Sequence, residues 1–348
     1  MSIRELPLPS FYDPKNADRF AYAPDEQAVF TAAAEHRRAH GIRPSGSDGK
    51  EVHLLLIDVQ KDFCFPQGSL FVGGRSGRGA MDDSRRIAEM VYRNLGGISQ
   101  ITTTMDTHFA YQIFFPSFWV DREGEPLGAH REISAEEVDS GEVRPNPTVA
   151  KWLCGGNYGW LVQQARHYTR ELTKAGKYKL YLWPPHCLLG GAGHALAGVV
   201  HEARLFHAFA RGAQSHVEVK GGHPLTENYS ILQPEVLTRH DGRPLAQRNT
   251  GFLRTLLGAD AVLIAGQAAS HCVKSSIDDL LSEVVATDPK LARKIYVLTD
   301  CMSAVAVPDG KGGLAADFAP LAEAALQRFA DAGMNLVKST EPMESWLR

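Results

Sequence analysis

The chain has 348 residues, of which 44% are hydrophobic and 22% charged, and its formal net charge at pH 7 is −3. This composition is typical of a globular protein with a sizeable core, organised as one large domain or two. The small negative charge excludes a basic surface for nucleic acid or for an anionic membrane, so we expect neither as a partner.

Cysteine usage and the N-terminal sequence indicate a reducing compartment. The five cysteines are scattered, odd in number and form no CxxC pair, so a disulfide framework is not expected. The first residues, MSIRELPLPSFYDP, contain no apolar signal-peptide core. No segment reaches the roughly 18 uncharged apolar residues of a membrane span. We therefore expect a cytoplasmic protein.

Residues 1–50 are predicted to form an N-terminal extension and linker. Prolines and aromatic residues come first, then a short helix in DEQAVFTAAAEHRRAHG, then the polar linker PSGSDGK. Residues 51–348 are predicted to form the main domain.

Six apolar runs rich in β-branched residues follow, mostly separated by amphipathic segments of helical length. This alternation predicts a three-layer α/β/α fold with a mostly parallel, Rossmann-like sheet of about six strands. Two polar stretches near 109–165 and 221–248 carry Gly and Pro and are too long for simple connections, so we expect surface insertions there. The six predicted strands are 52–59, 100–108, 178–186, 215–220, 261–266 and 294–300.

Reactive side chains follow these strands. In open α/β sheets, ligands bind beyond the carboxyl ends of the strands. We therefore expect a site at this edge of the sheet. The residues placed there are Asp58, Asp106, His108, Trp183, His186, Lys220 and Cys272.

Cys272 follows the predicted strand 261–266 in the stretch GQAASHCVKSS. Apolar residues from Val273 onward have helical spacing, and Ser270 is a plausible N-cap. The first helical turn offers unpaired N–H groups and the positive end of the helix dipole, which favour a thiolate. A buried structural cysteine is the alternative interpretation.

Asp58, Lys220 and Cys272 form a candidate nucleophilic set. Desolvation would raise the pKa of Asp58, which could then accept the thiol proton, and Lys220 could stabilise a thiolate or an oxyanion. Singly, Asp58 could cap a helix and Lys220 could be a surface lysine. Their joint placement at adjacent strand ends favours catalysis.

Asp106 and His108 are two residues apart, so an extended strand points both side chains to one face. With His186 they offer two imidazoles and a carboxylate, a set suited to Zn²⁺, Fe²⁺ or Mn²⁺. Phe63 and Trp183 flank the same edge and could enclose a flat ring, or they could pack a core.

The segment LLLIDVQKDFCFPQGSL resembles the opening of nicotinamidases and related cysteine hydrolases of the isochorismatase-like superfamily. The segments TTTMDTH, LWPPHCLLGGAG, VEVKGGHPLTENYSIL, GQAASHCVKSSIDDL and VLTDCMSAV…FADAGMNLV resemble this family too, in the family's order. The resemblance covers most of residues 52–338 and implies that 51–348 is a domain of this type.

The resemblance also implies roles for individual residues. The positions of Asp58, Lys220 and Cys272 match the catalytic triad, and those of Phe63 and Trp183 match the walls around the substrate ring. A cis peptide before Ala268 would let its N–H and that of Cys272 form the oxyanion hole. The matching metal ligands are Asp106, His108 and His186.

The implied reaction deamidates nicotinamide or a similar small heteroaromatic amide through a thioester. One divalent transition metal, zinc first and iron or manganese as alternatives, would hold the pyridine nitrogen. We also expect a homo-oligomer. Another hydrolase of ureido or carbamoyl substrates is the nearest alternative. Isochorismatase activity is less favoured because those enzymes typically lack the cysteine. A metal-centred enzyme with an incidental Cys272, or a non-catalytic module that keeps the fold, are the remaining alternatives.

Overall fold

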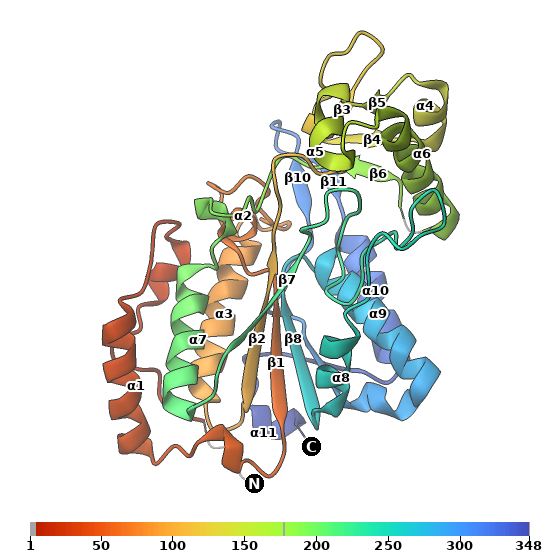
Figure 1. The fold of residues 1–348 in the computed structure, drawn as a ribbon. Helices are drawn as coiled ribbons and strands as arrows, with labels where there is room; N and C mark the ends of the chain where they lie inside the picture. Colours follow the sequence, from red (N-terminus) through yellow and green to blue (C-terminus); the bar gives the residue numbers. More distant parts are fainter. Residues whose placement is uncertain (1–4, 177, 348) are drawn as a thin grey trace.

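The computed structural model describes residues 5–176 and 178–347. Its centre is a six-stranded sheet in the order β12-β9-β8-β1-β2-β7, and every neighbouring pair is parallel. Figure 1 shows helices packed along these strands. The predicted three-layer α/β/α fold is confirmed. The strands are β1 Val52–Ile57, β2 Gln100–Asp106, β7 His216–Lys220, β8 Ala261–Gly266, β9 Ile295–Leu298 and β12 Asn335–Val337.

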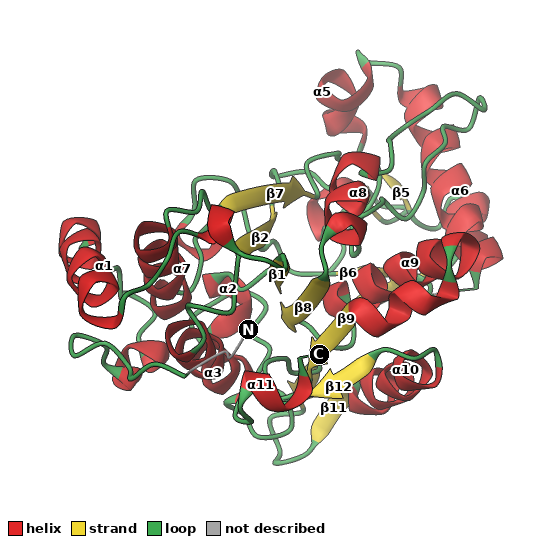
Figure 2. Ribbon diagram, turned by 90° about the horizontal axis from the view of Figure 1, so that it is seen from below, coloured by secondary structure: helices red, strands yellow, loops and turns green. Residues whose placement is uncertain are grey.

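Two groups of helices cover the two faces of the sheet, as the end-on view in Figure 2 shows. Alternate residues of β1 serve opposite faces, because successive side chains of a strand point in opposite directions. Leu55 and Ile57 belong to one apolar core and Leu54 and Leu56 to the other. The first face carries α8 Thr250–Gly258, α9 Cys272–Thr287 and α10 Ala319–Asp331, and the second α1 Glu26–His40, α3 Gly79–Arg93, α7 Gly198–Arg211 and α11 Met343–Trp346.

The predicted strands differ from the observed sheet in two places. The prediction for 178–186 is wrong, because only β6 (Leu180–Leu182) forms there and it pairs antiparallel with β4 (Arg131–Ile133), outside the main sheet. Pro184 and Pro185 follow, and proline supplies no N–H to a ladder. The sixth strand is instead β12. This strand has only three residues and closely follows α10, so its apolar run is too short to stand out in the sequence.

Residues 109–165, predicted to be a polar surface insertion, lie only partly at the surface. Phe114, Phe118 and Trp119 are at most 1% exposed and belong to the same core as Cys272. Figure 1 shows this segment beyond the carboxyl ends of the strands, the same end of the sheet at which α2 (Lys61–Cys64) follows β1. We call residues 109–182 the cap. Its elements are β3 Trp119–Val120, β4, α4 Ala135–Ser140, β5 Arg144–Pro145, α5 Ala150–Cys154, α6 Tyr158–Ala175 and β6.

The described residues before β1 pack on α7 and α3. The predicted helix forms as α1, which lies against α7. The Tyr22 hydroxyl donates to Glu202, and Arg211 pairs with Asp48 in a buried ion pair. No helix within the described residues combines the length and apolarity that crossing a bilayer requires. The remaining elements are β10 Ala306–Pro308, β11 Leu314–Asp317 and the 3₁₀ helices Pro14–Asp18, Ser45–Ser47, Pro116–Phe118, Pro147–Val149, Ala192–His194 and Pro289–Lys294.

Candidate active site

Asp58, Lys220 and Cys272 meet at the carboxyl edge of the sheet. Asp58 follows β1, Lys220 ends β7, and Cys272 begins α9 after β8. Lys220 Nζ lies 2.9 Å from Asp58 Oδ2 and 3.6 Å from Cys272 Sγ. The three residues are 0%, 5% and 7% exposed. The parallel topology therefore brings together a carboxylate, an ammonium group and a thiol that are far apart in the sequence.

The environment of Asp58 suits a general base. Burial raises the pKa of Asp58, although the charge of Lys220 and a hydrogen bond from Thr104 act in the opposite direction. Its backbone N–H also donates to Thr104 Oγ1 at 3.0 Å. A carboxylate with a raised pKa holds a transferred proton more readily than an ordinary aspartate does.

Cys272 differs from the sequence prediction in two respects. The N-cap of α9 is His271, not Ser270, whose hydroxyl instead accepts from the Val305 N–H at 3.1 Å. Burial raises the pKa of Cys272 well above that of a free thiol, and Lys220 offsets this only in part. The expected thiolate at the helix terminus is therefore not favoured in the resting site. Asp58, which shares the Lys220 ammonium with the sulfur, is the carboxylate placed to accept the thiol proton.

The turn before Cys272 carries two free donors. A cis peptide bond joins Gln267 to Ala268. Within the described part of the chain, neither the Ala268 nor the Cys272 N–H donates a hydrogen bond. Donors of this kind suit an oxyanion hole. The Gln267 amide, itself fully buried, donates to Asp83 Oδ2 at 2.9 Å and so ties the turn to α3. No pattern in the sequence indicates this buried pair.

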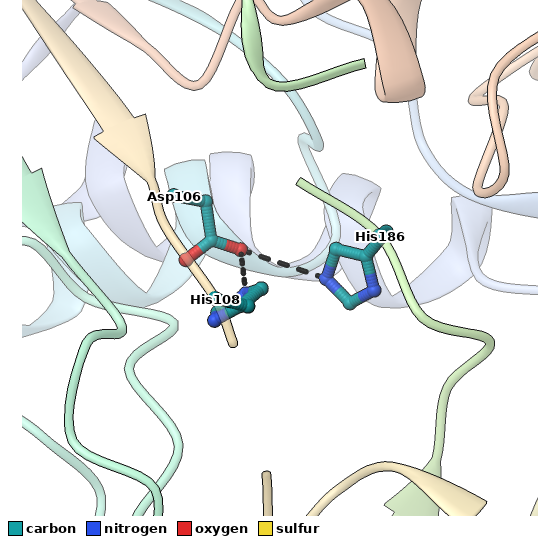
Figure 3. Close-up of side chains that lie close together, drawn as sticks. All are labelled: Asp106, His108 and His186. Carbon is teal, nitrogen blue, oxygen red and sulfur yellow. Dashed lines mark hydrogen bonds and ion pairs between the residues drawn. The ribbon is translucent and has the colours of Figure 1, made fainter. Parts of the chain in front are cut away.

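Asp106, His108 and His186 form a buried cluster beside this set (Figure 3). His108 Nε2 lies 2.8 Å and His186 Nε2 3.6 Å from Asp106 Oδ2. The potential ligand atoms all lie within 4.8 Å of one another. Asp106 Oδ1 is 2.9 Å from Lys220 Nζ, so the cluster adjoins the candidate nucleophilic set.

The donor set fits a divalent transition metal. His108 Nδ1 faces the Gly221 carbonyl oxygen at 3.2 Å, and His186 Nδ1 faces that of Pro184 at 2.8 Å. These carbonyls favour a proton on each Nδ1, which leaves both Nε2 lone pairs directed at the Asp106 carboxylate. The site therefore presents three donor atoms, two imidazole nitrogens and a carboxylate oxygen, with no proton between them. Such a set of donors is suited to binding a cation.

Two backbone features position these imidazoles. A Cβ on Gly221, whose φ is +82°, would lie 2.5 Å from His108 Cε1, so the close approach requires glycine. His186 was predicted to end a strand of the main sheet. It instead follows β6, in the loop that contains Pro184 and Pro185. The His108 N–H holds this loop by donating to the Cys187 carbonyl at 3.0 Å.

Phe63 and Trp183, the predicted ring walls, both line the pocket that contains Cys272. The Trp183 indole N–H donates to the Tyr229 hydroxyl at 2.7 Å, which fixes the plane of the indole. The pocket holds about 460 Å³ of non-protein space. Its other lining residues are Leu70, Val72, Asp106, His108, Phe114, His186, Glu227, Asn228, Tyr229, Ala268, His271 and Val305.

Glu227 and His271 also line the pocket, although no sequence pattern indicated either residue as part of the site. Burial raises the pKa of Glu227 well above its ordinary value, so this carboxyl favours the protonated form. Its Oε2 has no hydrogen-bond partner in the described part of the chain. Burial lowers the pKa of His271 to about 4, so its ring is neutral near pH 7. Glu227 lies in 221–248, where composition had indicated only a surface segment.

No protein-family model and no curated protein matches this chain. Solved structures with a similar fold include a yeast nicotinamidase bound to the inhibitor nicotinaldehyde, which is 16% identical with a TM-score of 0.49 and aligns over 82% of this chain and 99% of its own. A nicotinamidase and pyrazinamidase of Acinetobacter baumanii is 19% identical, with a TM-score of 0.47 and coverages of 84% and 99%. A zinc complex of a Pyrococcus horikoshii pyrazinamidase is 16% identical, with a TM-score of 0.41 and coverages of 83% and 99%.

Proposed function

We propose that this protein is a cysteine amidohydrolase that converts nicotinamide or a similar small heteroaromatic amide into the acid and ammonia. The proposal is supported most directly by the position of Lys220 Nζ, which lies 2.9 Å from Asp58 and 3.6 Å from Cys272 beside a pocket lined by aromatic residues. The ordered motifs that resemble nicotinamidases support the same reaction. In this proposal residues 51–348 form the catalytic domain.

The first half of the reaction forms a thioester. Asp58 takes the thiol proton as the sulfur of Cys272 attacks the amide carbon, so a buried thiolate never has to exist alone. The Ala268 and Cys272 N–H groups stabilise the oxyanion that develops on the amide oxygen. As the tetrahedral intermediate collapses, the C–N bond breaks and Asp58 returns its proton to the departing ammonia.

The second half releases the acid. Asp58, again ionised, takes a proton from a water molecule that attacks the thioester carbon. The C–S bond then breaks, and the proton returns to the sulfur of Cys272. The sum is one amide and one water converted into one acid and one ammonia. The Lys220 ammonium compensates the negative charge throughout the reaction, whether this charge lies on Asp58 or on the sulfur.

Asp106, His108 and His186 would hold one divalent transition metal, with zinc as our first assignment. When bound, such an ion supplies a Lewis acid that can hold a ring nitrogen of the substrate. Phe63 and Trp183 would lie along the flat ring and exclude water from the reacting carbon. Together these residues select an aromatic amide with a metal-binding nitrogen over an aliphatic one.

Ammonia release from a panel of amides tests this proposal. We expect the metal-loaded protein to hydrolyse nicotinamide and pyrazinamide faster than benzamide, which has the same shape but no ring nitrogen. Ureido compounds should react slowest. Equal rates for nicotinamide and benzamide would contradict the role assigned to the metal, and release from ureido compounds alone would contradict the substrate class.

A further inference from the structure

A second cavity lies beside the edge strand β7, on the face of the sheet that α7 covers. It holds about 670 Å³ of non-protein space and shares no lining residue with the pocket of Cys272. The segment Tyr22–Pro24 contributes to its walls, as do the first turns of α7. Three basic residues line it, namely Lys61, His201 and Arg204, which we call the basic cluster.

Two members of the basic cluster lack an anionic partner. Lys61 Nζ donates to the Tyr22 carbonyl at 3.3 Å, and the Arg204 guanidinium donates to Ser215 Oγ and His201 Nδ1, each at 3.1 Å. Arg204 is only 9% exposed, and its Nε has no hydrogen-bond partner among the described residues. Neither side chain forms an ion pair within that part of the chain. Buried cations are normally paired, since removal from water is costly.

The positive charge of the basic cluster comes from Lys61 and Arg204, whose pKa values burial lowers. Burial also lowers the pKa of His201, and the charges of Arg204 and Lys61 lower it further, so this ring serves as the acceptor for Arg204. Among the residues that the structure describes, the one carboxylate paired with the basic cluster is the solvent-exposed Glu26, 4.0 Å from His201 Nε2. The cavity also includes Gly198, the first residue of α7, whose N-cap has no capping side chain, so the positive end of that helix dipole adds to the field.

The remaining wall is apolar. Met105, Leu196 and Val217 line it, and Val217 is 47% exposed on the open edge of the sheet. A ligand that carries a negative group and an apolar body would compensate the cations and also remove Val217 from water. An inorganic anion would do only the first.

We propose that this cavity binds a small organic carboxylate, with its charge between Lys61 and Arg204 and its apolar body against Leu196 and Val217. The site is separate from the proposed amidase chemistry and does not depend on it.

Calorimetric titration of the metal-loaded protein with 4-bromobenzoate and with inorganic phosphate tests the proposal. We expect saturable binding of 4-bromobenzoate, at least tenfold tighter than phosphate. Lys61→Gln and Arg204→Gln should each weaken it at least tenfold. Arg254→Gln is the matched control, because it removes one exposed cation from α8, away from the cavity, and should leave the affinity unchanged.

The position of the ligand is read from bromine anomalous scattering in soaked crystals. A peak between Arg204 and Val217 is expected. A peak only in the pocket of Cys272, the absence of saturable binding, equal affinity in all three variants, or phosphate binding as tightly as 4-bromobenzoate would each overturn the proposal. If Arg204→Gln fails to fold, Lys61→Gln still decides the question, because Lys61 is only half-buried and should tolerate the change.

Discussion

Replacing Lys220 with methionine tests whether one buried ammonium holds two carboxylates in place. Lys220 Nζ lies 2.9 Å from both Asp58 and Asp106, and all three side chains are buried. Methionine keeps the unbranched shape but leaves both carboxylates without their cation. Removing one partner of a buried ion pair typically costs about 3–5 kcal/mol.

The expected loss converts into a thermal shift. With an unfolding entropy of about 2.1 cal/mol/K per residue, a chain of this length should lose about 4–7 °C in Tm. Lys274→Met is the matched control, because its partner Asp278, also 2.9 Å away, is partly exposed. That pair should contribute about 0–1 kcal/mol. Calorimetry of the metal-loaded variants measures both changes.

A double variant separates the ion pair from general packing. Asp58→Asn removes one of the two carboxylates, so Lys220→Met should cost less in that background, with a coupling of about 0.5–3 kcal/mol. If Lys220→Met matches Lys274→Met in stability, or if its cost is the same in both backgrounds, then Lys220 does not compensate these carboxylates.

Three further outcomes are expected of the candidate active site. Asp58→Asn should lower kcat by about 10²–10⁴-fold in steady-state assays. Combining it with Cys272→Ala should lower kcat little further, since the effects of residues that act as one catalytic unit are not additive. If the two losses multiply instead, the two residues act independently. His108→Ala should strip the metal, measured by elemental analysis, yet leave Cys272 open to iodoacetamide; retained metal would exclude His108 as a ligand. Burial lowers the pKa of His186, so this ring stays neutral and able to bind metal at about pH 6.5, the ordinary histidine pKa. Metal occupancy should therefore stay unchanged down to that pH and fall only below it, and a loss of half the metal above pH 6.5 would contradict this.

The sequence predicted the sheet and the position of the site because both follow from topology. A buried parallel strand shows as a continuous apolar run, and the residue after each run lies at one edge of the sheet. Asp58, Lys220 and Cys272 could be placed together on that basis alone, and the structure brings them within hydrogen-bonding range.

The features that the sequence did not reveal depend on packing between distant segments. Composition suggested that 109–165 was a surface segment, but Phe114, Phe115, Phe118 and Trp119 are buried in the core. Glu227 lies in a polar segment, and only the fold shows that it is buried in the pocket. The raised pKa of Cys272 has the same origin, because the helix terminus is visible in the sequence whereas the desolvation of the thiol is not.

The most direct test of the central claim is intact-protein mass spectrometry of the metal-loaded protein, acid-quenched during turnover of nicotinamide. The proposal predicts a mass increase of one nicotinoyl group, located by peptide mapping at Cys272 and absent from Cys272→Ala. Ammonia release by the wild-type protein without this adduct, or undiminished release by Cys272→Ala, would contradict the assignment of Cys272 as the nucleophile.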